Sequence, residues 1–447
     1  MRKSNNDSGL TVKRSYRRFI VGLTALAVSA AVCAQDFARL SERTIIGTAR
    51  YVGMAGAMSA IGGDPSAVRD NPAGLGLYRR TELMLTTDFA TYQGGLFTVP
   101  QASFEFSIPT NKLKEAGVLY HNFMFSYNRL HTYDQTYDAV GGNDLSLGDK
   151  LARLDGINWG DFKFCNDIYN TYNRTRVNEY GAVHEFAFNW GMNVSNTWYV
   201  GAGIRVQAYN FHSLGSYSED FATKNEQGRN MYLDNATSLY LGGAGCSAAF
   251  GLIYRPISWV RLGLGLETPS FGGINTRSSG TLTALTDSVR QSSAPIQNSS
   301  DKSFHQAFRT TASAALQVGA YGLLAFQYDY RHAYYMDDIH TLKVGLEFIP
   351  IVGLYVNLGY AYESTFKPYK PAPMDESFTR QDTYSFYPRV SQYASAAFGY
   401  RGTYMIVQAA YQFRWKQTAF YPLDDVAPFD IYNTTHRVVF TIAWHRD

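Results

Sequence analysis

The chain has 447 residues, of which 45% are hydrophobic and 15% aromatic, and a net charge of +3. Six basic residues and one acid lie within residues 1–34, so the remainder carries a net charge of −2 and nothing favours nucleic-acid binding. No stretch after residue 34 approaches 18 consecutive apolar residues, which excludes helical membrane spans.

The first residues predict a secretory signal peptide over residues 1–34. A basic segment precedes the apolar run "FIVGLTALAVSAAV", which is short for a membrane-spanning helix, and small residues follow it around Cys33. Acylation of Cys33 is a weaker alternative, because Val32 fits poorly before a lipidated cysteine. In the exported part, Cys165 and Cys246 permit one disulfide without implying it, and their spacing suggests no metal or other cofactor.

The next segment, "GTARYVGMAGAMSAIGGDPSAVRDNPAGLG" (47–76), combines small residues with dense turn chemistry. Asp64-Pro65 reads as a helix N-cap with proline at the first helical position, and Asn71-Pro72 ends that single turn. Glycines then allow the chain to reverse into the first strand. We interpret this segment as a rigid hatch, with the candidate hatch residues Gly62, Gly63, Asp64, Pro65, Asn71, Pro72, Ala73 and Gly74.

The rest of the chain alternates apolar and polar or glycine residues with the period of a β-strand. Near the C-terminus, Val438, Phe440 and Ile442 share one face, while charged or polar residues share the other. About fourteen such segments begin near residues 81, 97, 117, 183, 197, 237, 259, 304, 322, 339, 353, 390, 403 and 435.

Connections between these segments alternate between short turns and long loops. The long ones cover about 139–182, 212–236, 268–303, 363–389 and 417–434. Tight turns at one end and large loops at the other are typical of outer-membrane barrels, whereas a soluble sandwich has no reason to keep that order. We therefore predict an all-β fold: a transmembrane antiparallel β-barrel over 81–447 with an N-terminal luminal plug over 35–80.

The size of the barrel supports the plug. Fourteen tilted strands make a cylinder about 28 Å wide, and a bore of roughly 15 Å would leak solutes. Residues 35–80 have about the volume needed to fill it.

Two sets of side chains are candidates for contact with a ligand. Inward-facing charges could pair inside the lumen or meet a ligand carboxylate: Arg205, Arg261, Lys343, Glu347, Arg414 and Lys416. Aromatic residues expected in the long outer loops could capture a hydrophobic molecule: Phe211, Tyr217, Phe221 and Phe271. A third set, at the ends of strands, fits interfacial girdles: Trp198, Tyr199, Trp259, Tyr355, Tyr404, Trp415, Phe420 and Trp444.

The segment "GMAGAMSAIGGDPSAVRDNPAGLG", placed before about fourteen strands, resembles the hatch of the FadL (OMPP1/TodX) family of outer-membrane transport proteins. The family's Asn-Pro-Ala hatch motif is matched by Asn71, Pro72 and Ala73. The resemblance implies a monomeric barrel in the Gram-negative outer membrane that takes up long-chain fatty acids or aromatic compounds passively. It also implies lateral release through a kinked third strand, which should lie within 117–138.

Three other functions stay open at the level of sequence. A barrel of this kind could be a protein-secretion or surface-attachment partner, with the polar loop 139–182 as a docking surface, or it could be a purely structural barrel with a permanently shut lumen. Asp337, Asp338 and His340 could in principle activate water at an outer rim, but neither spacing nor a nucleophile elbow supports catalysis, so we expect no enzyme.

Overall fold

The computed structural model describes eleven stretches of the chain. They are residues 39–91, 95–110, 117–141, 168–223, 230–286, 290–292, 296–305, 307–332, 338–365, 385–421 and 429–446. The predicted signal peptide over 1–34, Cys165 and Asp337 lie outside these residues. None of the helices in the described stretches is long and apolar enough to cross a membrane.

A single antiparallel sheet closes on itself, because β1 pairs with β18 on one side and with β2 on the other. The wall strands β1 to β7 are Thr81–Ala90, Leu96–Pro109, Val118–Thr132, Gln135–Gly141, Ile168–Val194, Trp198–Thr223 and Asn230–Ile257. Strands β8 to β13 are Val260–Glu267, Phe271–Thr286, Arg290–Ser292, Ile296–His305, Phe308–Val318 and Gly322–His332. Strands β14 to β18 are Ile339–Ile351, Leu354–Thr365, Ser385–Arg401, Met405–Tyr421 and Phe429–Arg446.

The sheet has 18 strand segments but 14 positions in the wall, which confirms the predicted barrel. Three wall strands are interrupted: β3 and β4 both pair with β5, β8 and β9 both pair with β7, and β11 and β12 follow each other along β9 and β8. The short β10 pairs only with β9 among the described strands.

The strands alternate as the sequence predicts. On β14, Leu342, Val344 and Leu346 are exposed on the outer face, while Thr341 and Lys343 are buried on the inner face. Closure of the sheet gives each wall strand of the barrel a hydrogen-bonded neighbour on both sides along most of its length, which is the requirement for strands in hydrocarbon.

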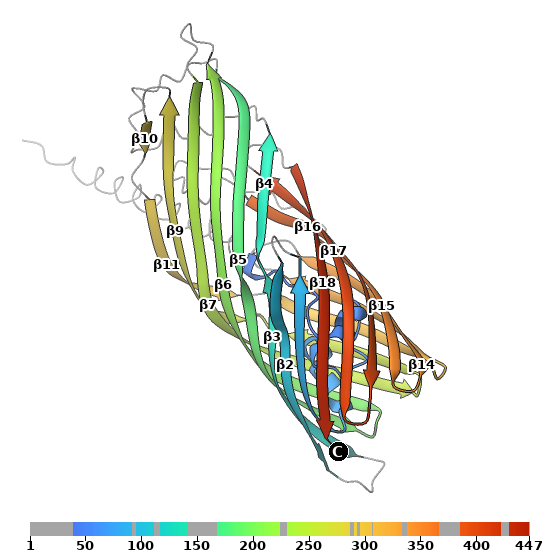
Figure 1. The fold of residues 1–447 in the computed structure, drawn as a ribbon. Helices are drawn as coiled ribbons and strands as arrows, with labels where there is room; N and C mark the ends of the chain where they lie inside the picture. The colour runs from blue at the N-terminus through green and yellow to red at the C-terminus, as the bar shows by residue number, and fades with distance from the viewer. Residues whose placement is uncertain are drawn as a thin grey trace, which may run out of the picture.

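Part of the sheet continues far beyond the barrel on one side (Figure 1). We call this extension the leaf; it consists of β4, β9, β11 and the adjoining ends of β5, β6 and β7. The predicted long loops 139–182, 212–236 and 268–303 are therefore wrong at both ends, where the described residues belong to strands. Their serine, threonine and asparagine content hides the apolar period of a half-buried strand, although the backbone pairs in regular ladders.

The N-terminal segment lies inside the barrel, where the blue elements of Figure 1 are enclosed by the wall. It contains α2 (Ala49–Gly53), α3 (Pro65–Asp70) and the 3-10 helix η1 (Pro72–Leu77). Nearly every residue from Arg39 to Gly76 is buried. The predicted luminal plug is confirmed for these described residues, and the exact limit at residue 35 stays a prediction.

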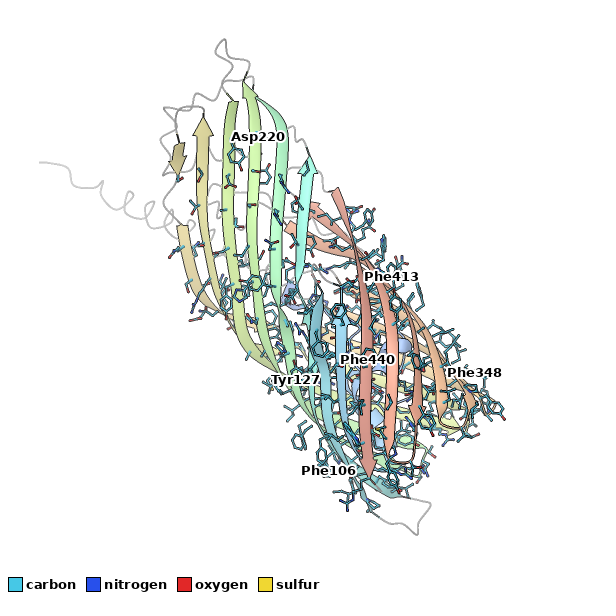
Figure 2. All side chains as sticks on the ribbon, viewed as in Figure 1. Phe106, Tyr127, Asp220, Phe348, Phe413 and Phe440 are labelled. Carbon is cyan, nitrogen blue, oxygen red and sulfur yellow. The ribbon has the colours of Figure 1, made fainter. Side chains whose placement is uncertain are left out.

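Only part of the predicted aromatic girdle faces outward. Trp198, Trp259, Tyr404 and Trp444 are 43–70% exposed, and Trp415 is half-buried. Tyr199, Tyr355 and Phe420 point inward and are buried, so their assignment to the girdle is wrong. The reason is the period of the strand: Tyr199 follows Trp198 directly, so the two side chains lie on opposite faces. Figure 2 shows outer rings such as Phe348 and Phe440 on the barrel and Asp220 far out on the leaf.

Candidate functional site

The hatch residues form a compact, self-capped turn system. Asp64 caps α3, accepting hydrogen bonds from the backbone N–H groups of Ser66 at 2.9 Å and Ala67 at 3.4 Å. Its other oxygen accepts from the hydroxyl of Thr48 at 2.7 Å, and Pro65 occupies the first turn as predicted. Burial raises the pKa of Asp64, and these hydrogen bonds oppose that shift.

Asn71 joins the plug to the wall. Its side-chain oxygen accepts from the backbone N–H of Ala73 at 3.1 Å, which caps η1, while its amide donates to the carbonyl of Leu252 on β7 at 3.3 Å. Gly62 has φ +62°, and a Cβ there would lie 2.7 Å from the Cα of Gly74. The Asn-Pro-Ala segment and these two glycines therefore fix one tight contact between two turns of the plug.

Two glycines of the wall, which the sequence did not single out, receive this contact. A Cβ on Gly201 of β6 would overlap the carbonyl of Pro72, and one on Gly251 of β7 would overlap the side-chain oxygen of Asn71. Plug and wall thus meet backbone to backbone. In the sequence, this contact is marked by one glycine on each of two adjacent strands. Gly201 and Gly251 pair directly with each other in the sheet, and both face inward.

A buried ionic cluster holds the C-terminal end of α3. The Asp70 carboxylate lies 2.9 Å from an Arg309 nitrogen and 3.7 Å from the Lys343 Nζ, and it accepts from the Tyr51 hydroxyl at 2.7 Å. Burial on its own raises the pKa of Asp70, but the surrounding cations outweigh it and hold that pKa below its ordinary value. Asp329 completes the cluster at 2.7 Å from Lys343.

Most of the predicted luminal charges contact the plug. Glu347 receives two hydrogen bonds from Arg50 at 2.6 and 2.9 Å, Arg205 donates to the carbonyl of Arg69 at 2.6 Å, and Arg261 donates to the carbonyl of Ile61 at 2.9 Å. Of the two alternatives that the sequence left open, pairing inside the lumen describes these residues. Arg414 lies apart, 3.4 Å from the hydroxyl of Ser391 and stacked over the ring of Tyr393.

The predicted capture residues lie on strands, so their assignment to loops is wrong. Phe211, Tyr217 and Phe221 belong to β6, and Phe271 begins β9. Phe211 and Tyr217 are buried on the inner face, whereas Phe271 is 55% exposed on the outer face and cannot line the mouth from there. The side chain of Phe221 lies outside the part of the chain that the structure describes.

Phe211 takes part in an apolar cluster where the leaf meets the barrel. Its edge contacts the ring of Tyr133 at a centroid distance of 4.7 Å, and Tyr209 contacts Phe304 in the same manner at 5.2 Å. The plug contributes Leu40 to this cluster, which also contains Leu130, Val183, Leu241 and Ile274. A buried apolar core therefore joins the plug to the inner face of the wall where the leaf begins.

One seam of the barrel wall is incomplete. The ladder between β2 and β3 ends at the pair Gln101 and Asn128, although β2 begins five residues earlier and continues to pair with β1 up to Leu96. Beyond that pair, β3 is bulged between Arg129 and His131 and is interrupted before β4 begins. This irregularity falls within 117–138, where the family resemblance places a kink.

The plug covers the free edge of β3 at this seam. The backbone N–H of Thr44 donates to the carbonyl of Leu130 at 3.1 Å, and the Thr44 hydroxyl lies 2.8 Å from Nδ1 of His131. Glu42 lies 3.5 Å from the same imidazole and is paired with Lys416 at 2.9 Å. We call residues 42–44 the latch, because they occupy the hydrogen-bonding position that β2 leaves vacant.

Two of the three rim residues considered for catalysis, Asp338 and His340, lie among the described residues. Asp338 accepts hydrogen bonds from Tyr330 at 2.9 Å and lies 2.7 Å from His332, while His340 stacks on Tyr328. Within the described stretches, no group of three or more potential ligands could hold a metal ion. The docking loop 139–182 is strand at both ends, and its middle, 142–167, lies outside the described residues.

Solved structures share this fold. A FadL homologue from Pseudomonas aeruginosa is similar with a TM-score of 0.52 and 13% identity, covering 91% of this chain and 100% of the other. The monoaromatic hydrocarbon channel CymD gives 0.52 and 13%, and the Pseudomonas putida toluene transporter TodX gives 0.50 and 13%, each over 91% of this chain and 99% of theirs. No family model and no curated protein matches the chain. The similarity confirms the expected fold, a hatch-bearing barrel of 14 strands.

Proposed function

We propose that the protein is an outer-membrane channel for passive uptake of hydrophobic small molecules, with the plug as its gate and the seam between β2 and β3 as its lateral exit. The observation that carries this proposal is the latch: the ladder between β2 and β3 stops short of the end of β2, and a plug segment hydrogen-bonds to β3 at that position from within.

The apolar cluster above the plug supports the first step of this route. Its aromatic and aliphatic side chains are buried against one another where the leaf meets the barrel, so a hydrophobic molecule that displaced them would leave water for an apolar environment. The latch lies next to this cluster, since Leu40 of the plug and Leu130 of β3 belong to it. A ligand bound there would contact the segment that has to move.

The seam supports the second step. A hydrophobic molecule meets the polar surface layer of a membrane as its barrier and is stable in the hydrocarbon core, so it needs to be carried only past the headgroups. A lateral exit between β2 and β3 releases the molecule into the hydrocarbon without opening the whole lumen of the barrel. The plug can therefore keep its contacts with Gly201 and Gly251 during transport. The similar channels named for monoaromatic hydrocarbons and toluene agree with an apolar ligand.

Locking the latch tests the proposal. The pair Thr44→Cys and His131→Cys replaces two side chains that touch between the latch and β3, in a background where Cys165 and Cys246 are serine. We expect oxidised cells to take up labelled oleate or toluene no faster than cells without the barrel, and dithiothreitol to restore uptake. Thr44→Cys alone is the matched control and should transport under both conditions.

Two results would contradict the proposal. Wild-type protein that gives no uptake of either probe above the empty-vector level would remove the transport function. Full uptake by the oxidised double variant, with the crosslink verified by mass spectrometry, would remove the lateral exit and leave a route through the bore.

A further inference from the structure

An apolar hollow lies on the outer surface of the barrel, across β1, β2, β3, β5 and β6. Its volume is about 650 Å³, and its lining includes the aromatic side chains of Phe104, Phe125, Phe186 and Phe188. No charged side chain lines it. It therefore faces the hydrocarbon of the membrane and not the lumen.

The sheet register explains the shape of the hollow. Phe104, Phe125 and Phe188 are direct neighbours on three adjacent strands, each 40–55% exposed, and the rings of Phe125 and Phe188 lie 4.8 Å apart. In the neighbouring row Ala102 stands beside Tyr127, where the small alanine side chain leaves a notch among large ones. The aromatic rings thus form the sides of the hollow, and the notch at Ala102 forms one end of it.

That end coincides with the seam. Ala102 and Tyr127 form the pair directly below Gln101 and Asn128, where the ladder between β2 and β3 stops. A molecule that passes between β2 and β3 reaches the notch at Ala102 before any other part of the outer wall. The hollow is therefore continuous with the proposed exit.

We propose that this hollow is an exit site, which holds the hydrocarbon portion of a ligand as it leaves the seam. The inference rests on the proposed function and takes as its ligand a molecule with an apolar portion that the uncharged hollow can hold. The inner side of the seam is polar, with Thr86, Gln101 and Asn128 facing the lumen, so the outer hollow supplies the apolar contacts that draw such a molecule outward. It acts as a binding site on the outside of the wall.

Filling the notch tests the inference. Ala102→Trp places a large ring in the end of the hollow nearest the seam. Ala312→Trp is the matched control, because Ala312 is an exposed alanine on β12, on a distant part of the same outer surface. We expect Ala102→Trp to slow oleate uptake about tenfold, the effect of a few lost methylene contacts, and Ala312→Trp to leave it unchanged.

Photolabelling of the wild-type protein locates the ligand directly. Palmitate carrying a diazirine in its chain, added to reconstituted vesicles, should label peptides of β2 and β3 around Ala102 and Tyr127 well above those of β12. A phospholipid carrying the same diazirine reports ordinary lipid contact and should label both regions alike.

The outcomes separate the two proposals. No uptake by the wild-type protein overturns the transport function itself. Normal uptake by wild type and by Ala102→Trp overturns the exit site alone. Equal labelling of β2–β3 and β12 by the palmitate probe, or selective labelling of the hollow by the phospholipid, shows a hollow filled by membrane lipid and also overturns it.

Discussion

Two inward-facing glutamates differ in their partners. Glu347 is fixed by Arg50 of the plug and by the amide of Asn357 at 3.0 Å. Glu105 is 1% exposed, has no side-chain donor among the described residues and lies directly opposite Glu82 in the β1–β2 pairing. The same residue type therefore stabilises the barrel at one position and, when ionised, destabilises it at the other.

Conversion of each glutamate to glutamine should separate these effects. Glu105 is buried without a cation beside it, so its carboxyl is most stable in the neutral form. Glu105→Gln should therefore change the free energy of unfolding by less than about 1 kcal/mol at neutral pH, and should raise it by about 1–2 kcal/mol at alkaline pH, where the carboxyl of the wild type would have to ionise. Glu347→Gln leaves Arg50 buried without its carboxylate and should lower it by about 3–5 kcal/mol. Urea unfolding in vesicles, followed by tryptophan fluorescence, measures both; a lower stability for Glu105→Gln would show a partner that the structure does not contain.

Among the elements, the plug depends on the wall as much as on its own turns. The α3 and η1 segments are short, and helices of this length are not stable alone. Their positions are set by Asn71, by the Asp70 cluster and by close approach to wall glycines. A change in the wall should therefore displace the plug without any change in the plug sequence.

Gly201→Ala is the sharpest test of that dependence. Its Cβ would overlap the carbonyl of Pro72, and relief of this overlap should cost about 1–3 kcal/mol of plug packing. We expect larger conductance in planar bilayers and higher antibiotic sensitivity. Gly273→Ala is the control, since a Cβ there meets no atom within 4 Å. Closed behaviour in both variants would show that the plug is not seated on this glycine.

For the whole molecule, the sheet divides into a barrel in hydrocarbon and a leaf in water. The strand β5 runs through both, whereas β3 and β8 end, and β12 begins, at the level where the leaf starts. Within the described residues, the leaf strand β11 pairs only with β9. Backbone hydrogen bonds in the leaf are thus closer to an edge and to solvent than those in the barrel.

Hydrogen exchange along β5 should show this division. We expect the amides of residues 174–180 in the leaf to exchange about a hundredfold faster than those of residues 183–194 in the barrel, because local opening in water is easier than in lipid. Both groups belong to one strand and are measured in the same sample, so each is the control for the other. Uniform protection over the whole strand would mean that leaf and barrel open as one unit.

The sequence alone was sufficient to predict those parts of the molecule whose side chains follow a regular local pattern. Alternating apolar residues such as Leu342, Val344 and Leu346 predicted the strands. The pairs Asp64-Pro65 and Asn71-Pro72 predicted the turns of the plug. The strands of the leaf were not predicted, because their polar residues do not alternate with apolar ones. The wall glycines, the latch and the seam escaped because each depends on the register between segments far apart in the chain, which no local pattern encodes.

The leaf also bears on how such a protein can change over generations. At roughly 3.3 Å per residue, the 27 residues of β5 extend about 90 Å, three times the roughly 30 Å of a hydrocarbon core. Antibodies and phages meeting the cell would touch the far end of this projection first, while plug, seam and outer hollow lie at or below its base. Selection by such agents can therefore change the exposed residues of the leaf without changing the residues of the proposed transport route.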